Sequence, residues 1–141
     1  MRTQSLNHST YQLMYHIVWG TKYRRRWLKP YVRQELERSF KETTEKYPTL
    51  RIEVMNTDED HVHLQIEIAP SIAVSDAVRA LKAHSSFRLR KTFKFIARMY
   101  LEKDSIWSVG YFVSSVGLDE ARIRKYIEHQ GKQELPQTAS F

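Results

Sequence analysis

Hydrophobic and polar residues alternate in two short stretches near the middle of the chain, as half-buried β-strands require. The first stretch covers residues 50–56 and the second covers residues 61–68. The polar segment 57–60, with the sequence Thr-Asp-Glu-Asp, lies between them, so the two strands are expected to form a hairpin. The side chains predicted to face the core are Leu50, Ile52 and Val54 in the first strand, then Val62, Leu64, Ile66 and Ile68 in the second.

Two longer segments have the apolar spacing of helices that bury one face. The first covers residues 29–48, with Pro30 where a helix commonly begins and Pro48 beyond its end. The second covers residues 71–93, and Ser75 is its expected N-cap. The stripes predicted to be buried are Val32, Leu36 and Phe40 in the first helix, and Val78, Leu81, Ser85 and Leu89 in the second.

The remaining strands and the last helix are predicted from shorter sequence patterns. Residues 11–21 form an aromatic and β-branched run, which predicts a central strand buried on both faces. A fourth strand is predicted at residues 108–117 and a last helix at residues 118–131, with acidic residues in its first turn. Residues 94–105 fit either a helix tail or a loop.

The predicted order is strand, helix, strand, strand, helix, strand and a final helix. This is the split βαβ, ferredoxin-like pattern of an α+β protein. It predicts an antiparallel sheet with two helices on one face and an extra C-terminal helix that carries Tyr126. We expect one domain over residues 1–141, with flexible tails at residues 1–10 and 132–141.

The composition indicates a folded protein that attracts polyanions. Lysine and arginine outnumber aspartate and glutamate by 23 to 16, which gives a formal net charge of +7. Positive charge lies beside aromatic residues in segments 21–27 and 82–95. This combination suits single-stranded nucleic acid, because cations neutralise phosphates and rings stack on unpaired bases. A solvated surface face is the alternative for either segment.

Several classes of protein are excluded by what the sequence lacks. It has no apolar run of membrane length, no secretory signal pattern and no cysteine. A disulfide framework and a thiolate metal site are therefore excluded. A cytoplasmic location is the simplest expectation, although a lack of cysteine is compatible with any compartment.

His61 and His63 stand two residues apart in the second hairpin strand, so their side chains are expected to project from one face. Two neutral imidazoles can supply two ligands to a divalent metal ion, although two surface histidines give the same pattern. Tyr126 and Gln130 lie four residues apart on the last helix and share a face there. A tyrosine with an ordinary pKa of about 10 is a poor nucleophile. A metal ion that withdraws charge from a phosphodiester makes its attack feasible, while a packing role is the alternative.

Four blocks of the sequence resemble, in the expected order, the single-tyrosine HUH transposases of small bacterial and archaeal insertion sequences that move as single-stranded DNA. The blocks are residues 15–28 (YHIVWGTKYRRRWL), 58–68 (DEDHVHLQIEI), 107–117 (WSVGYFVSSVG) and 123–130 (IRKYIEHQ). The resemblance therefore covers most of the chain. Transposases associated with REP repeats are close relatives of the same group.

The resemblance implies a role for each matching residue. His61, His63 and Gln130 would bind Mg²⁺ or Mn²⁺, and Tyr126 would attack a phosphodiester to form a 5′-phosphotyrosine and release a 3′-hydroxyl. The substrate would be single-stranded DNA with a hairpin near the element end, bound by a homodimer. His16 is assigned to packing within the sheet and is left out of the site. The basic residues expected to contact DNA are Lys22, Arg24, Arg25, Arg26, Lys82, Arg88, Arg90 and Lys91.

Three other functions were weighed against this interpretation. A histidine-triad nucleotide hydrolase needs a third histidine where Gln65 stands. An RNA-binding module with the same topology stacks bases on sheet aromatics, and residues 61–68 contain none. A domesticated relative that cleaves the hairpins of dispersed repeats would carry identical active-site residues, so the sequence leaves that alternative open.

Overall fold

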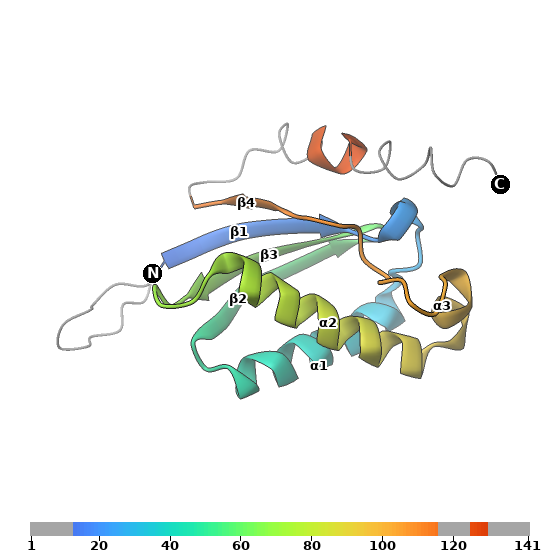
Figure 1. The fold of residues 1–141 in the computed structure, drawn as a ribbon, viewed down its shortest axis with the longest axis horizontal. Coiled ribbons are helices and arrows are strands. Elements are labelled where there is room, and N and C mark those ends of the chain that lie inside the picture. The colour runs from blue at the N-terminus through green and yellow to red at the C-terminus, as the bar shows by residue number, and fades with distance from the viewer. Residues whose placement is uncertain (1–12, 116–124, 130–141) are drawn as a thin grey trace.

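The computed structural model describes residues 13–115 and 125–129 (Figure 1). Its strands are β1 (Leu13–Gly20), β2 (Leu50–Asp58), β3 (His61–Ile68) and β4 (Phe112–Ser114). Its helices are the 3-10 helix η1 (Lys22–Arg24), α1 (Pro30–Lys46), α2 (Val74–Thr92) and α3 (Lys94–Met99). The helical residues 125–129 follow and are referred to as the tyrosine segment.

The four strands form one antiparallel sheet in the order β2-β3-β1-β4. This is the split βαβ arrangement, so the predicted α+β class and topology are confirmed. β1 pairs with β3 on one side and with β4 on the other. Its residues Ile17, Val18 and Trp19 are fully buried, as expected of a central strand covered on both faces.

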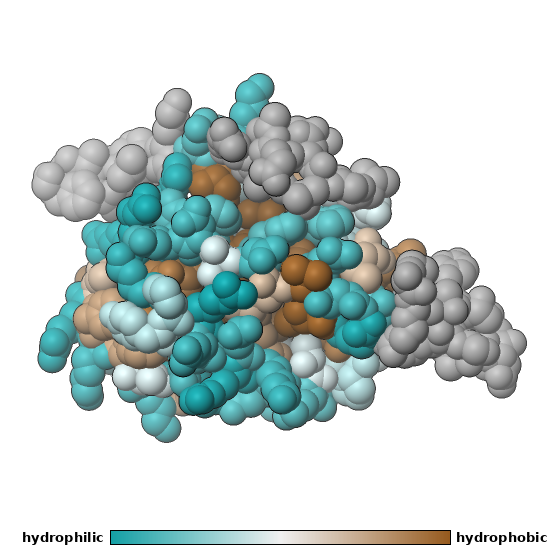
Figure 2. All heavy atoms as spheres, turned by 180° about the vertical axis from the view of Figure 1, so that it is seen from behind, coloured by the Kyte–Doolittle hydropathy of each residue, from teal (hydrophilic) through white to brown (hydrophobic). Residues whose placement is uncertain are grey.

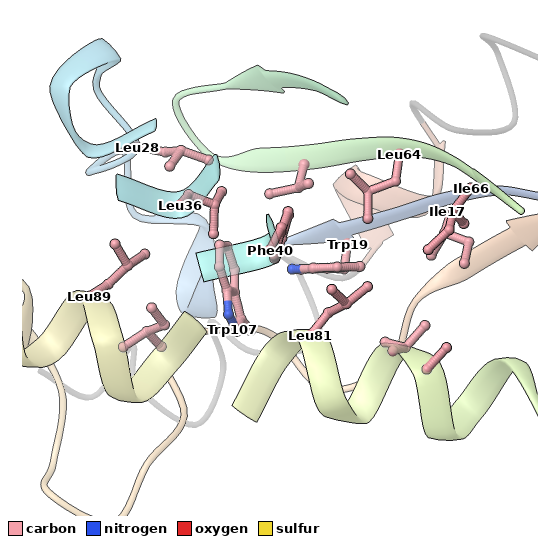
Figure 3. Packing of buried hydrophobic residues seen from close by; sticks show 14 of the residues in the cluster. Ile17, Trp19, Leu28, Leu36, Phe40, Leu64, Ile66, Leu81, Leu89 and Trp107 are labelled. Atoms are coloured by element: carbon pink, nitrogen blue, oxygen red, sulfur yellow. The ribbon is translucent and has the colours of Figure 1, made fainter. Parts of the chain in front are cut away.

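Helices α1 and α2 lie on one face of the sheet, and their apolar stripes supply the core (Figure 1). At its centre Trp19 of β1 packs edge-to-face on Phe40 of α1 and on Trp107, with ring centroids 5.9 Å apart in each pair. Figure 3 shows these rings together with Leu81 of α2. The stripes predicted from the helical spacing are therefore buried as expected.

The alternation predicted for the first hairpin strand is interrupted by a β-bulge between Ile52 and Val54. Val54 pairs with Gln65 and is 40% exposed, so the prediction that it faces the core is wrong. Met55 pairs with Leu64 and packs against the core instead. A bulge adds one residue to one strand only, which moves the following side chains to the opposite faces.

Two boundary predictions are also wrong. β2 continues to Asp58, so the hairpin turn contains only Glu59 and Asp60 instead of the four residues 57–60. α2 follows Ala73 without a side-chain cap, so Ser75 is not its N-cap. Both errors concern local hydrogen bonds at an element's end, which polar residue types alone do not determine.

The second half of the chain contains less regular structure than predicted. Residues 94–105, which fitted a helix tail or a loop, hold the short helix α3 and a loop. β4 has three residues, far fewer than the predicted strand 108–117. The last predicted helix is described only at the tyrosine segment. Gln130 and the expected flexible tails, residues 1–10 and 132–141, lie outside the described residues.

Seen from behind, the molecule is largely hydrophilic, with apolar patches between the polar side chains (Figure 2). Among the described residues, no helix is long and apolar enough to cross a membrane.

Candidate nucleic-acid and metal site

The two histidines of the candidate site project from the sheet face that α1 and α2 leave uncovered, which we call the outer face. Val62 and Leu64 of β3 are fully buried on the core side, and His61 and His63 alternate with them as half-buried residues. The strand geometry therefore brings both imidazoles to one face of the sheet.

His16 of β1 lies on the same face and contacts His63. Its Nδ1 atom is 3.4 Å from Nε2 of His63, and the two rings stack with centroids 5.6 Å apart. His16 is thus a sheet histidine, as expected, and its contact is with one of the two candidate ligands. The register explains the contact, because Val18 pairs with His63 and His16 is the next β1 residue on that face. Side chains alternate between the two faces along a strand, and this alternation could have placed His16 on the face away from the core. The continuous apolar run of β1 obscured the alternation.

His61 is held by the residue before it. Its Nδ1 atom is 3.0 Å from Oδ1 of Asp60, and the Asp60 side chain is 9% exposed. Arg24 donates to the other carboxylate oxygen, Oδ2, from Nε at 3.1 Å and from Nη2 at 2.9 Å. Both oxygens of this nearly buried carboxylate are thus engaged.

These partners determine the charge state of Asp60. The hydrogen bond from His61 and those from Arg24 lower the pKa of the Asp60 carboxyl from 3.8 to about 2, although burial acts in the opposite direction. Asp60 is therefore a carboxylate at any pH near neutrality. A carboxylate accepts hydrogen bonds only, so Nδ1 of His61 is the donor in this contact.

The donor set on this side of the sheet fits a divalent metal ion. Atoms of Asp58, Asp60 and His61 that could bind a metal lie within 4.8 Å of one another. Both Asp60 oxygens are already hydrogen-bonded, so Asp58 and His61 are the members of this group that remain available to a metal. A carboxylate that accepts from one ring nitrogen of a histidine leaves the other nitrogen for a metal, and metal-binding histidines are commonly oriented in this way. Imidazole nitrogen together with carboxylate oxygen suits Mn²⁺, and Mg²⁺ would rely more on oxygen ligands.

Tyr126 lies toward the β4 side of the sheet. Its ring centroid is 6.1 Å from that of Phe112, and its hydroxyl oxygen is 3.8 Å from the position a Cβ atom would take on Gly110. Phe112 pairs with Val18, which in turn pairs with His63. Phe112 and His63 therefore flank β1 about two strand spacings or ~10 Å apart, and Tyr126 lies beside Phe112.

The tyrosine segment lies on the side of the sheet away from α1 and α2 (Figure 1). Ile127 is 6% exposed, and Val18, which shares the outer face with His63, is fully buried. The burial of Ile127 indicates that the tyrosine segment packs one side against the rest of the domain. Gln130, the expected third ligand, lies outside the described residues, so its place relative to His61 is not described.

The eight candidate DNA-binding cations divide according to their partners. Three form ion pairs with carboxylates, which offset their charge. These pairs are Arg24 with Asp60, Arg26 with Glu59, and Arg88 with Glu35 and Glu42. Their side chains are thereby tied to protein carboxylates, so a phosphate would have to compete for them.

The other five make contacts of a different kind. Three donate to neutral backbone carbonyl oxygens: Arg25 to Met99, Lys82 to Ser108 and Gly110, and Arg90 to Leu101 and Asp104. Lys22 lies 5.3 Å from the centroid of the Tyr23 ring and Lys91 lies 5.9 Å from that of Phe87. A carbonyl or a ring does not cancel a cation, so these residues still attract phosphate.

A groove of about 790 Å³ runs between α2 and the loop around residues 102–111. Its lining combines cations with apolar side chains, a mixture that suits unpaired nucleotides. Phe87 is 63% exposed there. Gly110 lines one part of the groove and also lies beside the Tyr126 hydroxyl. The lining includes Lys82, Phe87, Arg90, Lys103 and Gly110, with Glu102 and Asp104 as its acidic members.

Comparison with known proteins agrees with this arrangement. The family model described as "Transposase IS200 like" matches residues 9–130. The chain is 33% identical over 127 residues to the transposase for insertion sequence element IS200 of Salmonella typhimurium, covering 90% of this chain and 82% of the relative. It is 33% identical over 129 residues to the ISDra2 transposase TnpA of Deinococcus radiodurans, covering 88% of each.

Two solved structures are similar in fold. A transposase from Deinococcus radiodurans R1 matches with a TM-score of 0.81 and 28% identity, covering 90% of this chain and 97% of that one. A REP-associated tyrosine transposase bound to a REP hairpin matches with a TM-score of 0.57 and 12% identity, covering 90% of this chain and 69% of that one. The second match supports the fold alone.

Fold and sequence therefore agree on one class, DNA transposases built on a four-stranded antiparallel sheet with helices. Within that class, the chain belongs to the family of IS200-like transposases. The resemblance drawn from four blocks of sequence is confirmed at the level of this family.

Proposed function

We propose that this transposase cleaves and rejoins single-stranded DNA at insertion-sequence ends through a 5′-phosphotyrosine at Tyr126. The observation that carries the proposal is that His61 and His63 share the outer face of the sheet and that Tyr126 flanks the same central strand. A divalent ion held by the two imidazoles, with Gln130 as a third ligand, would complete the site. A bound Mg²⁺ or Mn²⁺ ion would polarise the scissile phosphodiester and offset its developing charge.

The reaction exchanges one ester bond for another. The Tyr126 oxygen bonds to phosphorus while the bond from phosphorus to the 3′ oxygen breaks. The phenol proton leaves to solvent, and the released 3′ oxygen takes up a proton to become a hydroxyl. A 3′-hydroxyl later attacks a phosphotyrosine, which restores the phenol and joins two DNA ends. The number of phosphoester bonds is unchanged, so no ATP is needed.

Positively charged side chains would hold the strand near these groups. We assign this role to the cations that contact carbonyl oxygens or rings, above all Lys91, which is exposed and lies at the ring of Phe87. Contacts of this kind position a nucleic acid without reading its sequence. Gly110 lines the groove beside α2 and lies next to the Tyr126 hydroxyl, so a strand bound at this part of the groove would pass close to Tyr126.

The remaining parts of the proposal concern partners. We propose a homodimer that binds a hairpin near the element end. One structural neighbour was solved with a REP hairpin, which supports hairpin binding in a related fold. A role for the host instead of the mobile element would need the same active-site residues. Comparing cleavage at element-end hairpins with cleavage at dispersed-repeat hairpins separates the two.

The deciding experiment is a covalent-adduct assay with single-stranded and double-stranded element ends, in Mg²⁺, Mn²⁺ or EDTA. On a denaturing gel we expect an adduct only with single-stranded DNA and metal. Tyr126→Phe should bind the same DNA and form no adduct, because it lacks the attacking oxygen. Tyr47→Phe, at an exposed tyrosine that follows α1, is the matched control. A normal adduct yield from Tyr126→Phe would remove Tyr126 from its role.

Salt dependence tests the assignment of the cations. Affinity for a single-stranded end should fall steeply as salt rises. Lys91→Gln should reduce the salt slope by about one unit, the effect of losing one phosphate contact. Arg88→Gln removes a cation that Glu35 and Glu42 already neutralise, so its slope should change less. Equal changes in the two variants would contradict this division of the cations.

A further inference from the structure

We propose that Arg24 and Asp60 form a positioning pair that holds His61 in one tautomer, with the proton on Nδ1 and the lone pair on Nε2. Neither residue would touch the DNA or the metal ion. Only the last step, that Nε2 is then the atom that binds a metal, rests on the proposed function. The tautomer itself is a property of the metal-free protein.

The geometry at Asp60 leaves the carboxylate little freedom. Oδ1 faces Nδ1 of His61 at 3.0 Å, and Oδ2 accepts two hydrogen bonds from Arg24. The backbone of Asp60 is fixed as well, since its carbonyl oxygen accepts from the backbone N–H of Thr21 at 2.9 Å and from its hydroxyl at 3.3 Å. The carboxylate is thus held against the imidazole from both its own backbone and the guanidinium.

The backbone that carries Arg24 adopts an unfavourable conformation. Tyr23 and Arg24 are the only described residues other than glycine with positive φ angles, 60° and 52°. Side chains with a Cβ atom rarely adopt this region, and strain of this kind is found where surrounding contacts require it. Arg24 donates to Asp60 from this conformation. The strained turn after β1 therefore delivers a guanidinium to the carboxylate behind His61.

This contact has a chemical consequence for His61. A carboxylate paired with a guanidinium can only accept, so the neutral imidazole must place its proton on Nδ1. A histidine that ligates a metal commonly donates its other ring N–H to such a carboxylate, which fixes the tautomer and the ring orientation. The nearby Arg26–Glu59 ion pair does not touch His61 in this way. Its side chains are 67% and 38% exposed, so it provides a matched control.

The test measures the tautomer directly in metal-free protein. Histidine labelled with ¹⁵N would be examined by NMR in alkaline buffer, and the His61 signals identified by their loss in His61→Gln. We expect His61 of the unaltered chain to be the Nδ1–H form. Asp60→Ala should give a mixture of tautomers because the acceptor is lost. Arg24→Gly should also give a mixture, because a carboxylate that the guanidinium no longer holds can turn away from Nδ1. Arg24→Gly also relieves the positive φ, so it should fold, and Arg26→Ala should leave His61 unchanged.

Metal affinity provides the second readout. By calorimetry, Mn²⁺ binding should weaken about tenfold or more in Asp60→Ala and in Arg24→Gly, the usual effect of losing a group that orients a metal-binding histidine, and stay unchanged in Arg26→Ala. An unaltered chain that binds no Mn²⁺ would refute the metal role in the proposed function, and the tautomer would still decide this inference. The inference is overturned if His61 keeps a single Nδ1–H tautomer in both variants, or is the Nε2–H form in the unaltered chain.

Discussion

Replacing Asp60 with asparagine should make the stability of this fold less dependent on pH. Asparagine keeps the shape of the side chain and loses the charge that Arg24 and His61 stabilise. The carboxylate is only 9% exposed, so solvent screens these interactions weakly. The change therefore isolates the contribution of one ionised group.

The magnitude follows from the pKa of Asp60, which is about 2 in the folded protein against an ordinary value of 3.8. Each unit is worth about 1.4 kcal/mol, so the ionised group favours the folded state by roughly 2 kcal/mol at neutral pH. Because the pKa is lowered, this stabilisation is complete above the unfolded value. It is lost as the pH falls through the folded value, and about half remains near pH 3.

The measurement is urea unfolding of both proteins in EDTA at pH 7, 4 and 3. The difference in unfolding free energy between the unaltered chain and Asp60→Asn should shrink by about 1 kcal/mol from pH 7 to pH 3. Asp76→Asn is the control, because its carboxylate is 61% exposed and its ion pair with Arg79 contributes little. A difference that is the same at pH 7 and pH 3 would refute the reasoning about Asp60.

Two further predictions concern the hydrophobic core and the backbone at Gly110, beside the Tyr126 hydroxyl. Leu36→Ala should lower the unfolding free energy by about 2–5 kcal/mol, because the side chain is fully buried and its removal leaves a cavity. A loss below about 1 kcal/mol in urea unfolding would contradict the packing described. Gly110→Ala should cost about 1–2 kcal/mol in thermal or urea unfolding, because φ is +86° there, while the added methyl makes only an ordinary contact with Tyr126. No loss of stability would show that this backbone relaxes.

The fold was accessible from the sequence wherever a periodic pattern continued for a whole element. The helical spacing at Leu36 and Leu81 and the strand alternation at Leu64 each mark a face that is buried in the structure. Burial of that face is what stabilises each helix or strand, so the pattern predicts it. The errors at Val54 and Ser75 have another origin. A bulge and a helix cap depend on which backbone groups meet in three dimensions, and the residue types permit several answers.

The candidate site was likewise predictable from the sequence only in part. His61 and His63 could be placed on one face from their spacing alone, since strand geometry is local. The contact of His16 with His63 and the bonds from Arg24 to Asp60 join residues 47 and 36 positions apart. Such contacts follow from strand register and from a turn with positive φ angles, which no periodic pattern records. Arg24 was therefore expected at phosphates, whereas its guanidinium is bonded to a carboxylate.

The arrangement around Gly110 connects the groove with the proposed nucleophile. Lys82 of α2 donates to the carbonyl oxygens of Ser108 and Gly110, and Ser108 donates its N–H to the carbonyl oxygen of Gly20 at the end of β1. Val18 already pairs with Phe112, so residues 109–111 must bulge beside that end of β1. The bulge meets the Tyr126 hydroxyl on one side and the groove on the other. By tying α2 to this bulge, Lys82 links one wall of the groove to the backbone beside the Tyr126 hydroxyl.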